Sequence, residues 1–369
     1  MNVNTLFSNY ELTKLIIPYS TLQNLIILLL LIIIAGCTRK KEFSSFLDIK
    51  QTEQLKGIAI LLVVVGHLWV HVSSNRAVPV LGDYAVSLFL ILSGFGLSIS
   101  QTKEKIKADF ILRRFRRVVI PYWIVTLVII VTDFLLLNKA YSITDVITTL
   151  AGINFSTSVK QIDYTRWFIT LLLLYYLMFF IFYRFFNKAH ALIGIFSFSV
   201  ILCVLNITKI IQICSVESII AFPIGCLIAF YYEPILQIFN KRRVELFVGL
   251  LLLLTCPVYL LENQNTELIV KIALYGIKMA NSFLFCILLI LIIGRIGKFY
   301  YVSRFLSFCG LISFEIFLIH GPLLIKYNPI LKLFPPDFIL VSFILLLSLV
   351  LILSYCINKA LRPLVQKTV

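Results

Sequence analysis

Apolar runs, each close to 20 residues long, recur along almost the whole chain. They lie at about 20–37, 55–72, 84–100, 117–137, 167–186, 190–207, 213–232, 244–261, 271–294, 305–325 and 338–358. A helix of about 20 residues crosses the hydrocarbon core of a bilayer, whereas a transmembrane barrel needs shorter, alternating segments. Hydrophobic residues make up 60% of the 369, more than a soluble core requires. The sequence therefore predicts an all-α, polytopic helical membrane protein with eleven spans.

Basic residues gather in alternate connections between these spans. The chain carries 33 Lys and Arg against 17 Asp and Glu, a net charge of +16 that in a soluble protein would suggest a nucleic-acid partner. Here basic connections alternate with nearly uncharged ones, and the positive-inside rule assigns the basic ones to the cytoplasm. We therefore expect a multi-pass protein of the inner (plasma) membrane that contacts membrane lipids and has no nucleic-acid partner. Its N-terminus would lie outside and its C-terminus in the cytoplasm.

The first apolar run ends at Ile34-Ala35-Gly36-Cys37, which resembles a lipoprotein cleavage box. A signal peptide carries its basic residues in front of the apolar run, whereas here Arg39, Lys40 and Lys41 follow it. We therefore expect an uncleaved anchor. Residues 1–45 would form an extra N-terminal transmembrane helix with a cytoplasmic linker, and residues 46–369 the main transmembrane domain.

The eight cysteines all fall in or beside apolar runs. None forms a CxxC pair, and no histidine stands at metal-ligand spacing from one of them. We expect small apolar packing residues, with no metal site and no disulfide framework.

A cation and an imidazole stand eleven positions apart in the second apolar run. In a helix, eleven residues advance about 16 Å and turn about 20° beyond three full turns, so Lys56 and His67 share one face. His71 follows His67 on the same side, and Gly66 leaves room beside the ring. His67 would lie near the bilayer middle, where an ionisable side chain is costly and marks a candidate functional site. A neutral imidazole there can accept a hydroxyl proton and return it; the alternative is a buried core histidine.

Seven cations lie within residues 103–117. Positive charge of this kind holds a loop inside, and anionic lipid headgroups would also bind it. The number exceeds what topology needs, and guanidinium groups bind phosphates in a bidentate manner. We expect Arg113, Arg114 and Arg117 to bind a cytoplasmic ligand that carries several phosphates.

Two further runs contain polar residues among the apolar ones. Ser93 stands beside Gly94 and Gly96, where small residues favour either close helix packing or a channel for a narrow ligand arm. Glu315 and His320 lie five positions apart and therefore on different faces of one helix. His320 would lie toward the outer side, as an acceptor contact or a support for His67; the alternative is an interfacial histidine before a proline kink.

Together these segments resemble the acyltransferase 3 family of integral-membrane acyltransferases. The first core helix of that family carries Arg or Lys, ten residues and then His, as Lys56 and His67 do, although Lys is the less common residue there. The other matching segments are Leu88-Phe89 to Ser93-Gly94-Phe95, then Arg113, Arg114, Arg117, Pro121 and Tyr122, then Trp167-Phe-Ile, and the Phe-Leu-Ile-His of 317–320. The resemblance covers about residues 50–360 and implies a ten-helix acyltransferase core, to which this chain adds its N-terminal helix.

The resemblance implies O-acetyl transfer: an acyl group, commonly acetyl, passes from cytoplasmic acyl-CoA to a hydroxyl of a glycan or lipid-linked saccharide of the cell envelope. Acetyl-CoA would be a substrate, and no cofactor would be bound permanently. His67 would be the catalytic base. The donor would be bound by Lys56, Ser93, Arg113, Arg114, Arg117 and Tyr122, whereas the acceptor or the base would be contacted by His71, Trp167, Glu315 and His320. The alternative is a secondary transporter or flippase for a sugar or lipid-linked glycan, since transporters often contain broken helices.

Overall fold

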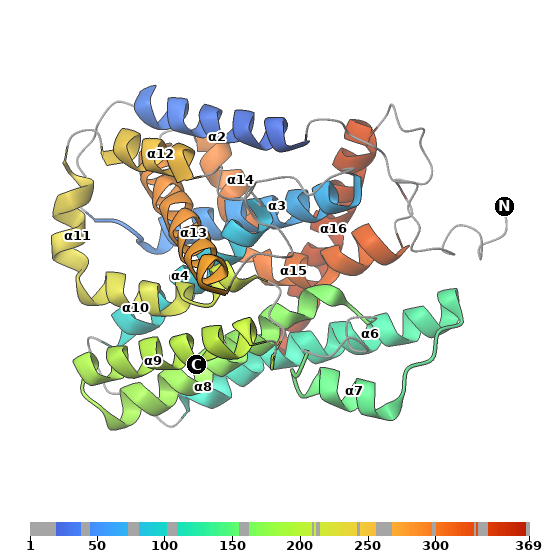
Figure 1. Ribbon diagram of the computed structural model, residues 1–369. Helices are drawn as coiled ribbons and strands as arrows, with labels where there is room; N and C mark the ends of the chain where they lie inside the picture. Colours follow the sequence, from blue (N-terminus) through green and yellow to red (C-terminus); the bar gives the residue numbers. More distant parts are fainter. Residues whose placement is uncertain are drawn as a thin grey trace.

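The computed structural model describes residues 20–37, 45–72, 81–101, 109–154, 162–208, 210–211, 215–241, 244–255, 268–296, 300–327, 330 and 339–366. These ranges form helices and connections without a strand, which confirms the all-α prediction (Figure 1). The first half of the chain contains α2 (Ser20–Cys37), α3 (Ile49–Val72), α4 (Leu81–Ser100), α5 (Phe110–Arg114), η1 (Phe115–Val119), α6 (Ile120–Leu137), α7 (Ile143–Leu150), η3 (Tyr164–Arg166) and α8 (Trp167–Phe185). The second half contains α9 (Lys188–Ile207), η4 (Val216–Ser218), α10 (Ala221–Phe230), α11 (Tyr232–Phe239), α12 (Val244–Thr255), α13 (Leu268–Ile296), α14 (Tyr300–Leu311), α15 (Ser313–Gly321), η6 (Pro322–Tyr327) and α16 (Ile339–Gln366).

Six stretches of helix within the described residues are long and apolar enough to cross a membrane, and the number rises to eight if each of two bent helix pairs is one span. They present large apolar side chains outward, as α6 does with Val128, Phe134 and Leu135, which are 59%, 61% and 68% exposed. Such a surface suits lipid rather than water. A polytopic helical membrane protein is therefore confirmed, whereas the predicted number of eleven spans, with a ten-helix core, stays a prediction.

Two of the predicted spans are bent rather than straight. The segment Val216–Phe230 turns by 91° into α11, and Tyr300–Leu311 turns by 67° into Ser313–Leu324. Pro234 explains the first bend, because a proline ring clashes with the carbonyl group four residues before it, which is that of Phe230, the last residue of α10.

Glycines bring two pairs of helices into backbone contact. A Cβ atom at Gly57 of α3 would overlap the Leu306 carbonyl group of α14, and one at Gly310 of α14 would overlap that of Glu53 in α3. The same reciprocal contact joins α4 and α10 through Gly94 and Gly225. Small residues allow such close approach of membrane helices. The two crossings fix the depth of the neighbouring residues, among them Lys56 and Ser93.

The helices α3 and α4 lie at the centre of the bundle. The structure packs α3 against α4, α14 and α15, while α8 and α9 run side by side at one edge and α2 packs on α12 and α13 at another (Figure 1). The central position of α3 brings residues from both ends of the chain around its buried face.

Candidate functional site

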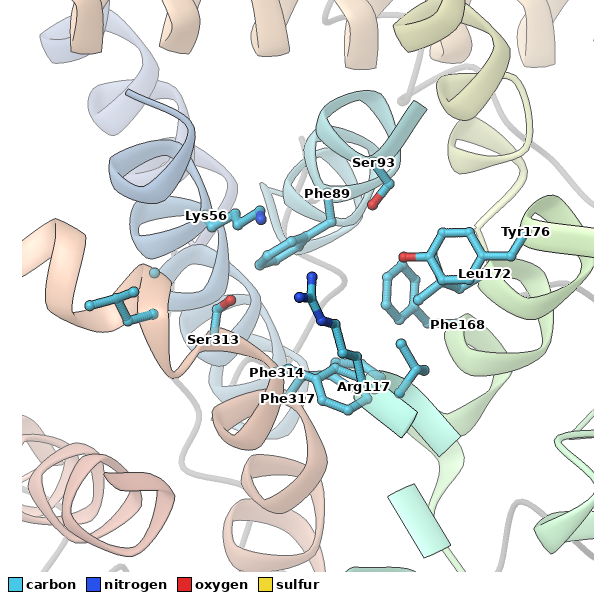
Figure 2. Close-up of a pocket in the computed structure, with 13 residues that line it drawn as sticks. Lys56, Phe89, Ser93, Arg117, Phe168, Leu172, Tyr176, Ser313, Phe314 and Phe317 are labelled. Carbon is cyan, nitrogen blue, oxygen red and sulfur yellow. The ribbon is translucent and has the colours of Figure 1, made fainter. Parts of the chain in front are cut away.

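A cavity of about 240 Å³ lies between α3, α4, η1, α8, α14 and α15 (Figure 2). Its lining residues are Lys56, Phe89, Ser93, Arg117, Val118, Phe168, Leu172, Tyr176, Gly310, Leu311, Ser313, Phe314 and Phe317. Figure 2 shows the Lys56 amine and the Arg117 guanidinium group pointing into the same space, with the hydroxyl groups of Ser93 and Tyr176 around it. The cavity therefore combines two cations, several hydroxyl groups and an aromatic wall.

The π-helical turn η1 brings Arg117 to this cavity. It interrupts the span formed by α5 and α6, and such turns occur often at functional sites. Arg114 lies just before the turn, with its guanidinium carbon 5.4 Å from the ring centroids of both Phe110 and Tyr176. Arg113 instead is exposed and pairs with Asp109 in the same helical turn. Of the three predicted donor-binding arginines, one lines the cavity and one packs against a lining residue, whereas the third points elsewhere.

His67 and His320 lie against each other. Their ring centroids are 5.0 Å apart and their planes are inclined by 36°. The ring of Phe317, which lines the cavity, is 5.9 Å from that of His320 and 5.0 Å from that of Phe168. Phe317 is therefore the lining residue that connects the cavity to the histidine pair.

The hydrogen bonds of His320 define its tautomer. Its Nδ1 lies 2.8 Å from the carbonyl oxygen of Phe317 and 3.1 Å from that of Ile316. A carbonyl oxygen only accepts, so Nδ1 carries a hydrogen and donates it. The other nitrogen, Nε2, is buried and has no hydrogen-bond partner among the described residues. In the neutral ring Nε2 is therefore a buried acceptor.

A buried ion pair lies beside His320. Arg166 Nε is 2.8 Å from an oxygen of Asp163, and the two side chains are 0% and 1% exposed. Arg166 also donates to the carbonyl oxygen of Leu318 over 3.0 Å, and Asp163 accepts from the hydroxyl of Thr165 over 2.8 Å. The pair therefore contacts α15 at two residues that flank His320, Leu318 and Gly321.

Three other predicted site residues, Tyr122, Trp167 and Glu315, lie apart from the cavity lining. Tyr122 is buried, and its hydroxyl donates to the carbonyl oxygen of Thr149. Trp167 is buried at the start of α8 against Phe168, and Glu315 accepts a hydrogen bond of 2.8 Å from Asn358 of α16. His71 belongs to α3, but its side chain lies outside the described residues.

Several residues of the site were missed by sequence reasoning, above all Asp163, Arg166 and Tyr176. One signal was available, because Asp163 and Arg166 stand three positions apart directly before the apolar run at 167–186. Within the described part of the chain, no group of three His, Cys, Asp or Glu side chains could hold a metal ion.

Comparison with known families gives a match over most of the chain. The model of the family described as "Acyltransferase domain", acyltransferase 3, matches residues 49–358. The match begins at the first residue of α3 and ends within α16, so it includes the cavity and the histidine pair. Comparisons with the curated proteins and with the solved structures gave no match.

Proposed function

The chain belongs to the acyltransferase 3 family of membrane acyltransferases, and we propose that it transfers an acetyl group from acetyl-CoA to a hydroxyl group of an envelope glycan or lipid-linked saccharide. The observation that carries this proposal is the position of the histidine pair behind a cavity lined by Lys56 and Arg117. Family membership favours transfer over the transporter alternative, although the two bent helix pairs are of a kind that transporters also contain.

The cations suit the phosphates of the donor. Lys56 and Arg117 line the cavity, with Arg114 beside it, and charge-assisted hydrogen bonds to phosphate are about twice as strong as neutral ones. The uncharged pantetheine arm would pass between Ser93, Tyr176 and Phe317, which offer hydroxyl groups and apolar surface. The thioester would then reach the histidine pair.

His67 would act as the general base. It would take the proton of the acceptor hydroxyl, and the resulting alkoxide oxygen would attack the thioester carbonyl carbon. Collapse of the tetrahedral intermediate would break the carbon–sulfur bond, and the His67 imidazolium would return the proton to the CoA thiolate. The apolar surroundings would exclude water and so limit thioester hydrolysis.

The orientation follows from the basic connections. The positive-inside rule would place the Arg113–Arg117 end of the cavity at the cytoplasmic face of the inner membrane, where acyl-CoA is available. The acceptor would then approach from the other face, near His320 and the segment that contains Asp163.

Everted membrane vesicles from producing cells test the proposal, because they expose the cytoplasmic face to added [¹⁴C]acetyl-CoA and supply the natural acceptor. We expect acetyl label in the glycan fraction, and a loss of about 100-fold or more in His67→Ala, since general bases contribute about 10²–10⁴-fold. Mass spectrometry of envelope glycans with and without the gene should show a difference of one acetyl group.

His190→Ala is the matched control, because His190 is exposed in α9 and bonds only locally to Asn187 in the described structure. Its transfer rate should equal that of the wild type. A His67→Ala variant that inserts and still transfers acetyl at the wild-type rate would disprove the mechanism. Gradient-driven sugar uptake without acyl-CoA would support the transporter instead.

A further inference from the structure

A buried ion pair joins the C-terminal part of α6 to η6, the turn that directly follows the helix of His320. Asp133 pairs with Lys326 of η6, and the two residues are 0% and 3% exposed. The carboxylate also accepts from the hydroxyl groups of Tyr141, over 2.6 Å, and Tyr327, over 2.7 Å. Lys326 Nζ donates in addition to Tyr141 Oη over 2.9 Å and to the carbonyl oxygen of Ile162 over 3.0 Å. All three hydrogens of the ammonium group are thus engaged.

The bond to Ile162 connects this pair to the histidine site. Ile162 directly precedes Asp163, and the segment 162–166 packs on α15 at both sides of His320. Before His320, Arg166 donates to the carbonyl oxygen of Leu318. After it, a Cβ atom at Gly321 would lie only 2.8 Å from an oxygen of Asp163. The position of the Asp163–Arg166 pair therefore depends on how this segment is held.

Stability alone does not explain a charged pair at this place. Replacing a buried ion pair by apolar residues is often neutral or stabilising, because desolvation offsets the attraction of the charges. An apolar pair, however, could not bind the Ile162 carbonyl group. What Lys326 adds is a fixed anchor for the backbone next to Asp163.

We propose that Lys326, held by Asp133, is a positioning residue of the acyl-transfer site: its bond to Ile162 fixes the Asp163–Arg166 pair beside His320. The catalytic part of this inference rests on the proposed function. The anchoring part rests only on the contacts of residues 162–166 and can be tested without substrate.

The test compares Lys326→Met with Lys139→Met. Lys139 is the matched control, because its amine lies 5.3 Å from the ring centroid of the same Tyr141, but in the described structure its side chain makes no hydrogen bond to Asp133 or Ile162. In the purified full chain in nanodiscs, we expect the amides of residues 162–166 to exchange about 10-fold faster in Lys326→Met, because local opening becomes easier. Lys139→Met should exchange like the wild type.

Acetyl transfer in everted vesicles gives the second readout. We expect the maximal rate of Lys326→Met to fall about 10-fold, with the KM for acetyl-CoA within about twofold, since a misplaced catalytic group lowers kcat rather than donor binding. Lys326→Arg keeps the charge and the donors and should restore most of the rate. If Lys326→Met does not fold, Asp133→Asn/Lys326→Met replaces it, because that pair leaves no unpaired buried charge and keeps an acceptor for the two tyrosines.

Unchanged exchange in residues 162–166 would overturn the anchoring part. Faster amide exchange in Lys326→Met together with a wild-type rate of acetyl transfer would overturn the catalytic part. An equal loss of acetyl transfer in Lys139→Met would overturn it as well. A wild-type chain without any acetyl transfer would overturn the proposed function and the catalytic part with it, whereas the exchange comparison would still decide whether Lys326 anchors the segment.

Discussion

The rings of His67 and His320 lie 5.0 Å apart, although one belongs to α3 and the other to α15, near opposite ends of the chain. Two imidazoles within an apolar bundle are costly to keep there, so chemistry explains the pair better than packing does. The bond from Nδ1 to the Phe317 carbonyl group fixes the ring of His320 and leaves its Nε2 as a buried acceptor.

Replacing His320 by leucine should separate stability from activity. A buried acceptor without a partner costs about 1–3 kcal/mol, and leucine removes it while filling similar space. We expect the unfolding temperature in detergent to stay equal or rise, whereas acetyl transfer falls about 10-fold or more because His67 loses its neighbour.

Thermal unfolding and vesicle transfer rates measure the two effects. His190→Leu is the control, because its ring is exposed and should change neither quantity. A clear fall in the unfolding temperature of His320→Leu would mean that the imidazole is a stabilising core residue, the alternative that the sequence had left open.

Removing a cation from the cavity should weaken binding of the donor. Lys56→Met and Arg117→Met should each raise the KM for acetyl-CoA about 10-fold with little change in kcat, since a bond between charged groups contributes about 1.5–3 kcal/mol. The wild-type KM should itself rise with ionic strength, because salt screens the attraction of phosphates to Arg117, which is exposed.

Arg304→Met controls for the loss of positive charge in general, because Arg304 is exposed in α14 and bonds to Tyr300. Its KM should match the wild type. An equal rise in all three variants would indicate attraction by net charge rather than a donor site.

Much of the fold followed from local pattern, and some of the site did not. Lys56 and His67 were placed on one face of a helix by spacing alone, which holds for any regular helix. The contact between His67 and His320 depends on how α3 packs on α15, and no local period reports that. Pro234 explains the bend after α10, but the continuous apolar run at 213–232 predicts one straight span.

Tyr122 shows a second limit of sequence reasoning. The family resemblance implies a contact between Tyr122 and the donor, whereas in the structure its hydroxyl donates to the Thr149 carbonyl group of α7. A tyrosine on a membrane helix can turn its hydroxyl group toward either neighbour, and the choice depends on which acceptor the fold brings near it, here one 27 residues farther along the chain. A role in donor binding stays a prediction.

Phe317 should limit the size of the acyl group. Its ring lines the cavity and contacts Phe168 and His320, so it forms the part of the cavity wall next to the histidine pair. Phe317→Leu shortens that wall, so we expect butyryl transfer to rise about 10-fold relative to acetyl transfer, since each added methylene group in an apolar pocket contributes about 1 kcal/mol. Phe314→Leu also enlarges the cavity, but the ring of Phe314 stacks on that of Phe317, which is the one that contacts His320, so it should shift the ratio less. Equal shifts would refute the role of Phe317.

Adding one methyl group to α3 should disturb both the bundle and the donor site. A Cβ atom at Gly57 would overlap the Leu306 carbonyl group of α14, and neither backbone can yield without separating the helices. We expect Gly57→Ala to lower the free energy of unfolding by about 1–3 kcal/mol, as overpacking does. Because Lys56 is the adjacent residue and lines the cavity, the KM for acetyl-CoA should rise as well.

Gly96→Ala in α4 is the matched control: nothing lies within 4 Å of its added Cβ, and alanine favours a helix over glycine by about 0.5–1 kcal/mol. In thermal unfolding, Gly57→Ala should therefore lower the stability and Gly96→Ala should raise it slightly. In donor titration, only Gly57→Ala should change the KM for acetyl-CoA. If the two variants behave alike, the contact between α3 and α14 does not set the position of Lys56.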